Sequence, residues 1–188
     1  MRRKLLIPLL PAFIAVSMSG CGYNTIQSYE ERVNSAQGQI ETTLQRRADL
    51  VPNLVETVKG FAQQESQVLT DVAQARSGLV GALQKSGGAD PQELAQADAQ
   101  LTRAINIVVE AYPELRSNEN FLRLQDELVG TENRVAVARQ DYNSAVEQYN
   151  AYIRRFPQNL TAKFTGATPH EYFQVTDAAN REAPQVKF

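Results

Sequence analysis

The stretch LQRRADLVPNLVETVKGF, residues 44–61, decides how this chain folds. Its apolar residues recur at helical spacing, but it also carries two arginines, Asp49 and, near its centre, Pro52. A proline inside a helix removes one backbone hydrogen bond, and it disfavours the helical conformation of the residue before it. The stretch therefore either ends one helix and begins another, or lies within a single kinked helix.

The lengths of the helical segments favour a break in this stretch. An unbroken helix over residues 24–86 would be about 95 Å long, whereas the last long segment, residues 118–156, would cover about 57 Å. A long part of the apolar stripe would then have no partner within the chain. We therefore expect a helix–turn at Asp49 and Pro52. Arg46 and Asp49 are expected to cap the helix ends there, and an exposed contact surface is the alternative for these two residues. The seven-residue register continues through the stretch, which favours the alternative of a kinked helix.

Helical periodicity extends over almost all of residues 24–156, without a convincing alternating strand. The sequence DPQE, residues 90–93, is a strong helix start, since it combines an Asp N-cap with Pro at the first helical position and Glu at the third. Pro113 is expected to end that helix, Ser117 or Asn118 to cap the next one, and Pro157 to end it. We predict an all-α fold, a four-helix up-and-down bundle with long helices.

The remaining residues, 157–188, contain three prolines and Gly166, and are predicted to form an irregular C-terminal tail with short helical turns. Phe164, Tyr172 and Phe173 are too apolar for a fully solvated segment. We therefore expect the tail to pack on the bundle, with part of it in a groove between helices.

The N-terminus reads as a targeting segment. Three positive residues, Arg2, Arg3 and Lys4, precede an apolar run that is short for a spanning helix of about 20 residues. The small residues just before Cys21 resemble a bacterial lipoprotein signal, which predicts a signal peptide over residues 1–20 and diacylglycerol on the Cys21 sulfur. An uncleaved signal anchor is the alternative.

We expect an exported, membrane-anchored lipoprotein that faces the periplasm or the cell exterior. The outer membrane is favoured where two membranes are present, because Gly22 is no Asp-type retention signal.

Composition excludes several classes of function. The chain has 188 residues, which suits one domain, here residues 21–156, and its single cysteine and single histidine exclude a disulfide framework and cysteine- or histidine-rich metal centres. Three of the 19 Lys and Arg residues lie in residues 1–20, so the mature chain carries 16 of them against 21 acidic residues. This balance argues against a nucleic-acid partner. No Glu-x-x-His pair is present for a di-metal bundle, and we expect no metal and no cofactor besides the acyl anchor.

Four charged residues fall on stripes that should face the core: Arg47, Glu65, Glu132 and Arg139. Because an unpaired buried charge costs several kcal/mol, such residues are expected in pairs. We interpret them as a structural buried-charge layer, with Glu65 paired to Arg139 and Glu132 paired to Arg47 or Arg103. The functional alternative is an envelope hydrolase that uses Glu65 and Glu132 as acid and base.

Two long motifs carry a family resemblance: QRRADLVPNLVETVKGFAQQE, residues 45–65, and EAYPELRSNENFLRLQDELVGTENRVAVARQDYNSAVEQYNAYIRRFP, residues 110–157. Together with the APQVKF ending they resemble the LemA family. The resemblance implies an all-helical, four-helix, membrane-attached domain without an established enzymatic activity or ligand. This chain departs from the family pattern at Gln37, often Trp, and at Gln64, where many members have His. The departure at Gln64 weakens any acid–base or metal role beside Glu65.

These observations together predict a membrane-anchored extracytoplasmic lipoprotein that acts as an interaction or scaffold protein of the bacterial envelope, and not an enzyme. Its expected partners are the membrane, through the lipid, and an unidentified envelope protein or a second copy of the chain.

Overall fold

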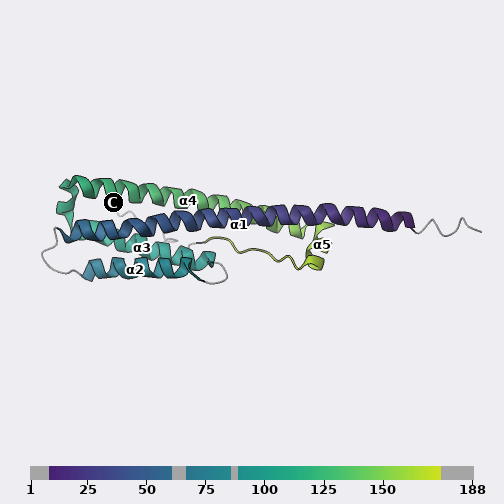
Figure 1. Ribbon diagram of the computed structural model, residues 1–188, viewed down its shortest axis with the longest axis horizontal. Helices are drawn as coiled ribbons and strands as arrows, with labels where there is room; N and C mark the ends of the chain where they lie inside the picture. The colour runs from purple at the N-terminus through teal and green to yellow at the C-terminus, as the bar shows by residue number, and fades with distance from the viewer. Residues whose placement is uncertain (1–8, 61–66, 86–88, 175–188) are drawn as a thin grey trace, which may run out of the picture. The chain divides into compact units, whose positions relative to one another are not determined.

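The computed structural model describes residues 9–60, 67–85 and 89–174, with side chains from residue 22 onward, and every regular element in these ranges is helical (Figure 1). The all-α prediction is therefore confirmed. In chain order the elements are α1 (Leu9–Lys59), α2 (Gln67–Leu83), α3 (Pro91–Ala111), the 3-10 helix η1 (Pro113–Ser117), α4 (Glu119–Arg154) and α5 (Gln158–Thr165).

The predicted turn at Asp49 and Pro52 is wrong, because α1 continues through both residues to Lys59. Pro52 has no N–H to donate to the carbonyl of Ala48, four residues earlier. The side chain of Arg76, on α2, donates its Nε–H to that carbonyl instead, at 2.9 Å. The backbone acceptor that the proline leaves unpaired is thus satisfied by a neighbouring helix, so that the helix does not need to break there.

The residues expected to cap helix ends at that turn have other partners. The Asp49 carboxylate accepts a hydrogen bond from Gln45 Nε2 at 2.8 Å, within the same helix. Arg46 lies 3.5 Å from Glu127 of α4 in a solvent-exposed ion pair. The chain leaves α1 at Lys59 and enters α2 at Gln67, with residues 61–66 outside the described ranges.

The other predicted helix boundaries are confirmed. Asp90 is the N-cap of α3, and its carboxylate accepts a hydrogen bond from the Gln92 backbone N–H at 2.9 Å. The side chain of Asn118 caps α4 by accepting from the Phe121 backbone N–H at 3.0 Å. Helices α3 and α4 end at Ala111 and Arg154, ahead of Pro113 and Pro157. Each boundary is set by a local side-chain or proline effect that can be read from the sequence.

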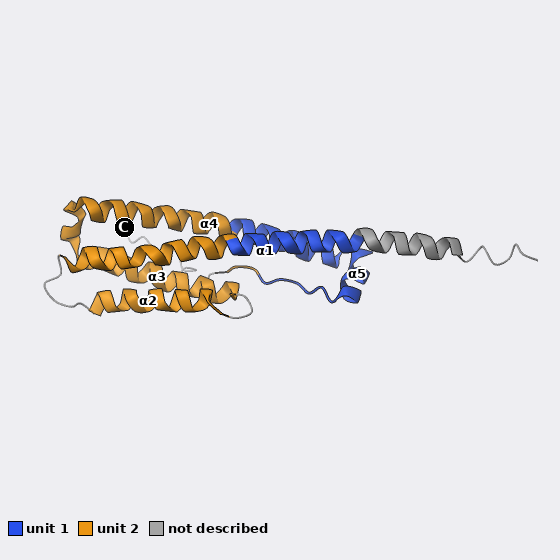
Figure 2. Ribbon diagram, in the orientation of Figure 1, with its two compact units in different colours: residues 1–38, 140–171 blue, residues 39–139, 172–188 orange. Residues whose placement is uncertain are grey.

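The described chain divides into two compact units, and α1 and α4 contribute to both (Figure 2). Unit 1 comprises the chain up to Gly38 together with Gln140–Glu171, and unit 2 comprises Gln39–Arg139 and the chain from Tyr172. In unit 2, α2 packs against α3, and Lys85 and Glu93 form an ion pair of 2.6 Å near their joined ends. The predicted apolar stripes supply its buried residues: Leu44, Val51, Leu54 and Val58 of α1, Val72 and Leu79 of α2, Leu94, Leu101 and Val108 of α3, and Phe121, Leu128 and Val135 of α4.

Unit 1 joins the first part of α1 to the last part of α4, and the chain after α5 lies along α4. Gly166 ends α5 with φ 75°, a left-handed conformation that favours glycine, and Ala167 N–H donates to Ala162 O at 2.9 Å. The side-chain amide of Asn150 then pairs with both backbone groups of His170, each at 2.9 Å. These contacts hold the segment 166–171 in place without regular secondary structure.

The aromatic residues of the tail differ from one another. Phe173 is buried in unit 2, and its ring centroid lies 4.8 Å from the Arg139 guanidinium carbon. Phe164, by contrast, is 94% exposed, and Tyr172 is 37% exposed. The buried side of α5 is formed by Ala162, and Phe164, two residues further along the helix, points to the other side.

Candidate functional site

Unit 2 contains a buried ion pair between Arg47 of α1 and Asp98 of α3. Arg47 Nη1 is 2.9 Å from Asp98 Oδ1, and the two side chains are only 2% and 4% exposed. Arg47 Nη2 also donates to the hydroxyl of Thr102, one turn after Asp98, at 3.0 Å. The guanidinium group therefore binds two consecutive turns of α3.

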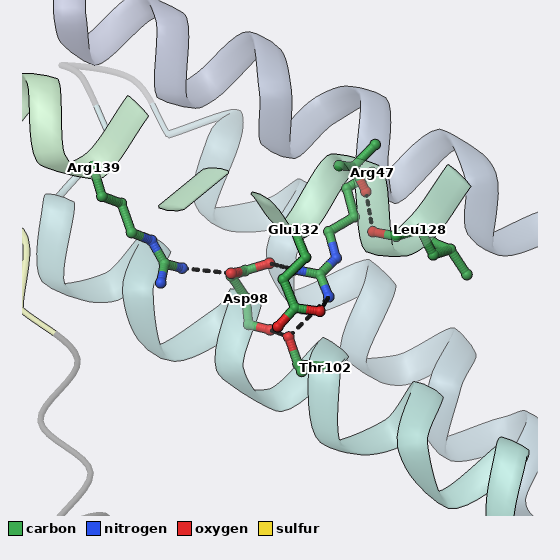
Figure 3. A network of polar contacts seen from close by, with 7 residues as sticks. Arg47, Asp98, Thr102, Leu128, Glu132 and Arg139 are labelled. Carbon is green, nitrogen blue, oxygen red and sulfur yellow. Dashed lines mark hydrogen bonds and ion pairs between the residues drawn. The ribbon is translucent and has the colours of Figure 1, made fainter. Parts of the chain in front are cut away.

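A second arginine binds the same carboxylate from another helix. Arg139 Nη2, on α4, donates to Asp98 Oδ2, so that each oxygen of Asp98 is bound by a different arginine (Figure 3). Glu132 of α4 completes the network at its edge, with Oε2 3.5 Å from Arg47 Nη2. We call Arg47, Asp98, Thr102, Glu132 and Arg139 the charge network. It joins α1, α3 and α4 within unit 2.

The opposite charges of the charge network compensate one another, but two of its buried nitrogen atoms have no hydrogen-bond partner among the described residues. Two guanidinium groups face two carboxylates, which compensates the cost of removing these charges from water. Burial lowers the pKa of Arg139 from its ordinary value, while the nearby Asp98 carboxylate opposes that shift. The Nε atoms of Arg47 and Arg139 are buried without a hydrogen-bond partner in the described part of the chain. The network is therefore a costly feature that depends on each of its charged members.

The structure brings together three of the four charged residues that the sequence singled out: Arg47, Glu132 and Arg139. Glu65 lies outside the described residues, and in the structure the carboxylate bound by Arg139 is Asp98. Glu132 was expected in the core, but its side chain is 54% exposed. It follows the fully buried Thr131 and reaches Arg47 from the edge of the helix interface, whereas Asp98 occupies the buried position between the two arginines.

Sequence reasoning missed Asp98, the carboxylate on which the network is centred. The signal was present, because Asp98 lies four residues after Leu94 and three before Leu101, on the buried stripe of α3. The same criterion selected Arg47 on the apolar stripe of α1, and Glu132 and Arg139 on α4. Applied to α3, it would have identified a central carboxylate for the two arginines.

The geometry limits what the charge network can do chemically. A cavity of about 90 Å³ borders it and is lined by Arg47, Thr102, Glu132 and apolar side chains such as Leu54 and Phe121. A carboxylate with both oxygens bound by guanidinium groups is poorly suited to accept a proton from a substrate. Among the described residues, no group of three His, Cys, Asp or Glu side chains could hold a metal ion. The arrangement fits a structural connection between helices.

A larger and shallower groove lies between α2 and α3. It encloses about 360 Å³ and is lined by Val68, Asp71, Gln74, Ala75, Gln100, Arg103, Ala104 and Ile107. Its mixture of short apolar and polar side chains, without a clustered pair of acid and base, favours no particular reaction. None of the helices in the described ranges is both long and apolar enough to cross a membrane.

Comparisons with known proteins agree with the motifs. The model of the LemA family matches residues 36–188. Magnetosome proteins MamQ 1 and MamQ 2 of Paramagnetospirillum magneticum are each 30% identical over 192 residues, which cover 90% of this chain and 70% of the relative. Protein LemA of Metamycoplasma hominis is 23% identical over 141 residues, covering 74% of this chain and 63% of the relative. The chain therefore belongs to the LemA family.

Proposed function

We propose that this protein is a lipid-anchored, extracytoplasmic scaffold of the bacterial envelope, without catalytic activity. It is held to the membrane through diacylglycerol on Cys21 and binds an envelope protein or a second copy of itself. The observation that carries this proposal is the closed charge network. Its central carboxylate, Asp98, is 4% exposed and is bound by two arginines, so the most conspicuous polar cluster of the described chain joins helices.

We also propose that unit 2 is a four-helix up-and-down bundle. Arg47 lies beside Glu132, and one heptad later Leu54 lines the same cavity as Phe121, which supports opposite directions for α1 and α4. Asp98 contacts Arg139 while Ile105, further along α3, shares that cavity with Phe121, which supports opposite directions for α3 and α4. Short connections between successive antiparallel helices are typical of such bundles.

The exposed surface supports a binding role. Leu122, Val129 and Val137 are 42%, 51% and 58% exposed on α4. Their spacings of seven and eight residues place them on one side of the helix. An exposed apolar side of a helix suits an interaction with a protein partner. We call these three residues the α4 stripe.

The MamQ relatives are named after a structure, the magnetosome, and not after a reaction, which also favours a role in an assembly.

The hydrolase alternative, with Glu65 and Glu132 as acid and base, has no support from the relatives' names or from the described site. Glu132 has Arg47 as its charged neighbour at 3.5 Å. Purified protein should show no turnover on glycan, peptide or phosphoester substrates. Reproducible hydrolysis that is abolished by Glu65→Gln would overturn the non-catalytic proposal.

The anchor is tested by metabolic labelling with palmitate. The parent chain should take up the label and be cleaved before Cys21, whereas Cys21→Ser should remain an unlabelled precursor. Equal labelling of both chains would contradict lipidation at Cys21 and favour a signal anchor.

The binding role is tested by photo-crosslinking in native membranes. A photoreactive amino acid at Val129 should give a discrete product, and the same group at the exposed Arg134, also on α4, serves as the matched control. Combining Leu122→Asp with Val137→Asp should abolish the product at position 129. The proposal fails if positions 129 and 134 give the same products, or if the double substitution leaves the product unchanged.

A further inference from the structure

The short helix α5 presents an exposed apolar side that belongs neither to the charge network nor to the α4 stripe. Phe156, Leu160 and Phe164 are 79%, 59% and 94% exposed. Leu160 and Phe164 are spaced by four residues and lie on one side of α5, and Phe156 lies two residues before the helix begins. Ala162 faces the opposite way and is 4% exposed. We call the three exposed residues the α5 stripe.

The charged residues in the sequence segment that contains the α5 stripe are of one sign. No Asp or Glu occurs between Glu147 and Glu171, whereas Arg154, Arg155 and Lys163 lie in this segment and are exposed. The rest of the mature chain is acidic, so this positive segment contrasts with its surroundings. Apolar and aromatic side chains flanked by Lys and Arg are the composition of helices that lie in the membrane–water interface.

Packing within unit 1 places α5 beside the proposed lipid anchor. A Cβ atom added at Gly22 would lie 3.4 Å from Oγ1 of Thr161, on α5. Gly22 directly follows Cys21 in the sequence, and Tyr23, the next residue, is 44% exposed. Figure 2 shows α5 and the adjoining part of α1 within the same unit. A lipid on Cys21 would therefore hold α5 close to the bilayer surface.

We propose that α5 is a membrane-surface helix, with the α5 stripe inserted among lipid headgroups and Arg154, Arg155 and Lys163 bound to anionic lipid phosphates. This inference rests on the proposed function, because acylation of Cys21 brings the helix to the membrane. The charge pattern favours a lipid surface over a protein partner, since the bilayer supplies both an apolar layer and negative headgroups. Tyr23 adds an aromatic side chain of the kind enriched at that depth.

The test uses the full acylated chain, in which Cys21 is the only natural cysteine and its sulfur is blocked by the lipid. A single introduced cysteine can then carry an environment-sensitive dye. Leu160→Cys and Phe164→Cys report on α5, and Val137→Cys is a matched control, because Val137 and Leu160 are 58% and 59% exposed. The proteins are reconstituted in vesicles of phosphatidylethanolamine and phosphatidylglycerol that contain lipids with nitroxide-labelled acyl chains.

The expected result is strong nitroxide quenching of the dye at positions 160 and 164, and little quenching at position 137. Equal quenching at all three positions would overturn the proposal, because it would indicate general adsorption. Shielding of positions 160 and 164 from an aqueous quencher without nitroxide quenching would also overturn it, since a protein surface would then cover α5. Dye uptake by the parent chain would instead show that Cys21 is not acylated, which separates failure of the anchor from failure of the inference.

The basic residues provide an independent arm of the test. A Lys or Arg near an anionic surface contributes roughly a fivefold factor to binding. Replacing Arg154, Arg155 and Lys163 with Gln should therefore lower the quenching at Phe164→Cys to the level measured in vesicles of neutral phosphatidylcholine. Quenching that is unchanged by these substitutions and by lipid charge would overturn the assignment of anionic headgroups. All three side chains are exposed, so thermal unfolding should be unaltered.

Discussion

Each of the two units contains a part of α1 and a part of α4, but the buried polar contacts inside the two units are of different kinds. In unit 2 the main buried polar contacts are ionic, between Arg47, Asp98 and Arg139. In unit 1 they are neutral, between the Asn150 amide and the backbone of His170. A buried charge whose partner is removed remains costly throughout the folded state, whereas a neutral side chain that loses a backbone partner frees one segment. The comparison predicts global sensitivity in unit 2 and local sensitivity in unit 1.

The largest effect is expected from Arg47→Met, which removes one partner of the buried ion pairs in unit 2. The substitution keeps an apolar side chain of similar length but leaves Asp98, 4% exposed, with Arg139 as its remaining charged partner. Removing one member of a buried ion pair typically costs about 3–5 kcal/mol. The free energy of unfolding, measured by urea denaturation, should fall by about this amount.

Two controls distinguish burial from loss of charge. Arg46→Met removes the neighbouring arginine, whose ion pair with Glu127 is 59% and 47% exposed, and should cost no more than about 1 kcal/mol. Combining Arg47→Met with Asp98→Leu and Arg139→Met should recover much of the lost stability, since an apolar replacement of a buried ionic cluster is often close to neutral. Similar losses for Arg46→Met and Arg47→Met would contradict the assignment of a buried network.

The next effect is expected from Asn150→Ala in unit 1. The substitution removes a donor and an acceptor that each bind His170 backbone at 2.9 Å, and leaves those backbone groups without their partner. We expect a cost of about 1–3 kcal/mol. Amide hydrogen exchange should accelerate at His170 but not at Leu101, in the core of unit 2. Gln148→Ala, on the exposed side of α4, is the matched control, and uniform acceleration in both units would contradict local release.

The sequence allowed the helical class and most helix ends to be predicted because those features are local. The Asp90 N-cap, the Asn118 cap and the helix ends before Pro113 and Pro157 all depend on residues close together in the chain. The charge network was only partly predictable. Arg47 and Arg139 lie on apolar stripes that can be identified from the sequence. The choice of Asp98 as their shared partner depends on the packing of α1, α3 and α4.

The course of the chain at Pro52 could not be predicted from local rules. The break was inferred from the lengths of the helical segments and from Pro52, which leaves the carbonyl four residues earlier without its usual donor. In this molecule that carbonyl, of Ala48, is paired by Arg76 from α2. The compensating residue lies 24 positions after the proline in the sequence. Only tertiary packing reveals that it donates to this backbone acceptor, so local propensity was overridden by a long-range contact.

A smaller effect is expected from Arg76→Met, since it removes a hydrogen bond from a charged donor to the Ala48 carbonyl. The expected cost is about 1–2 kcal/mol. The dependence on Pro52 is tested by a double-mutant cycle with Pro52→Ala, which restores an N–H that can donate to Ala48. Arg76→Met should cost clearly less in the Pro52→Ala background. Equal costs in both backgrounds would show that Arg76 stabilises α1 by another route.

The smallest effect is expected in the way the stability of unit 1 depends on pH. Burial, with the nearby carboxylate of Glu30, raises the pKa of Tyr149 above its ordinary value of 10.0. The folded protein therefore holds this proton more tightly than the unfolded chain. The resulting stability is fully present below pH 10 and is lost as the pH rises through the raised pKa.

Tyr149→Phe keeps the ring, whose centroid lies 4.8 Å from that of His170, but removes the ionisable hydroxyl. The free energy of unfolding of this variant should fall less steeply above pH 10 than that of the parent chain, whatever their difference at neutral pH. Tyr152→Phe, whose ring packs against Tyr29 in the same unit, controls for the loss of one tyrosine hydroxyl. If both variants show the parent's slope, the proton on Tyr149 does not contribute to the stability of unit 1. The alkaline loss would then have to arise from other groups, and the neutral side of the comparison would rest on the Asn150 amide and its backbone partners.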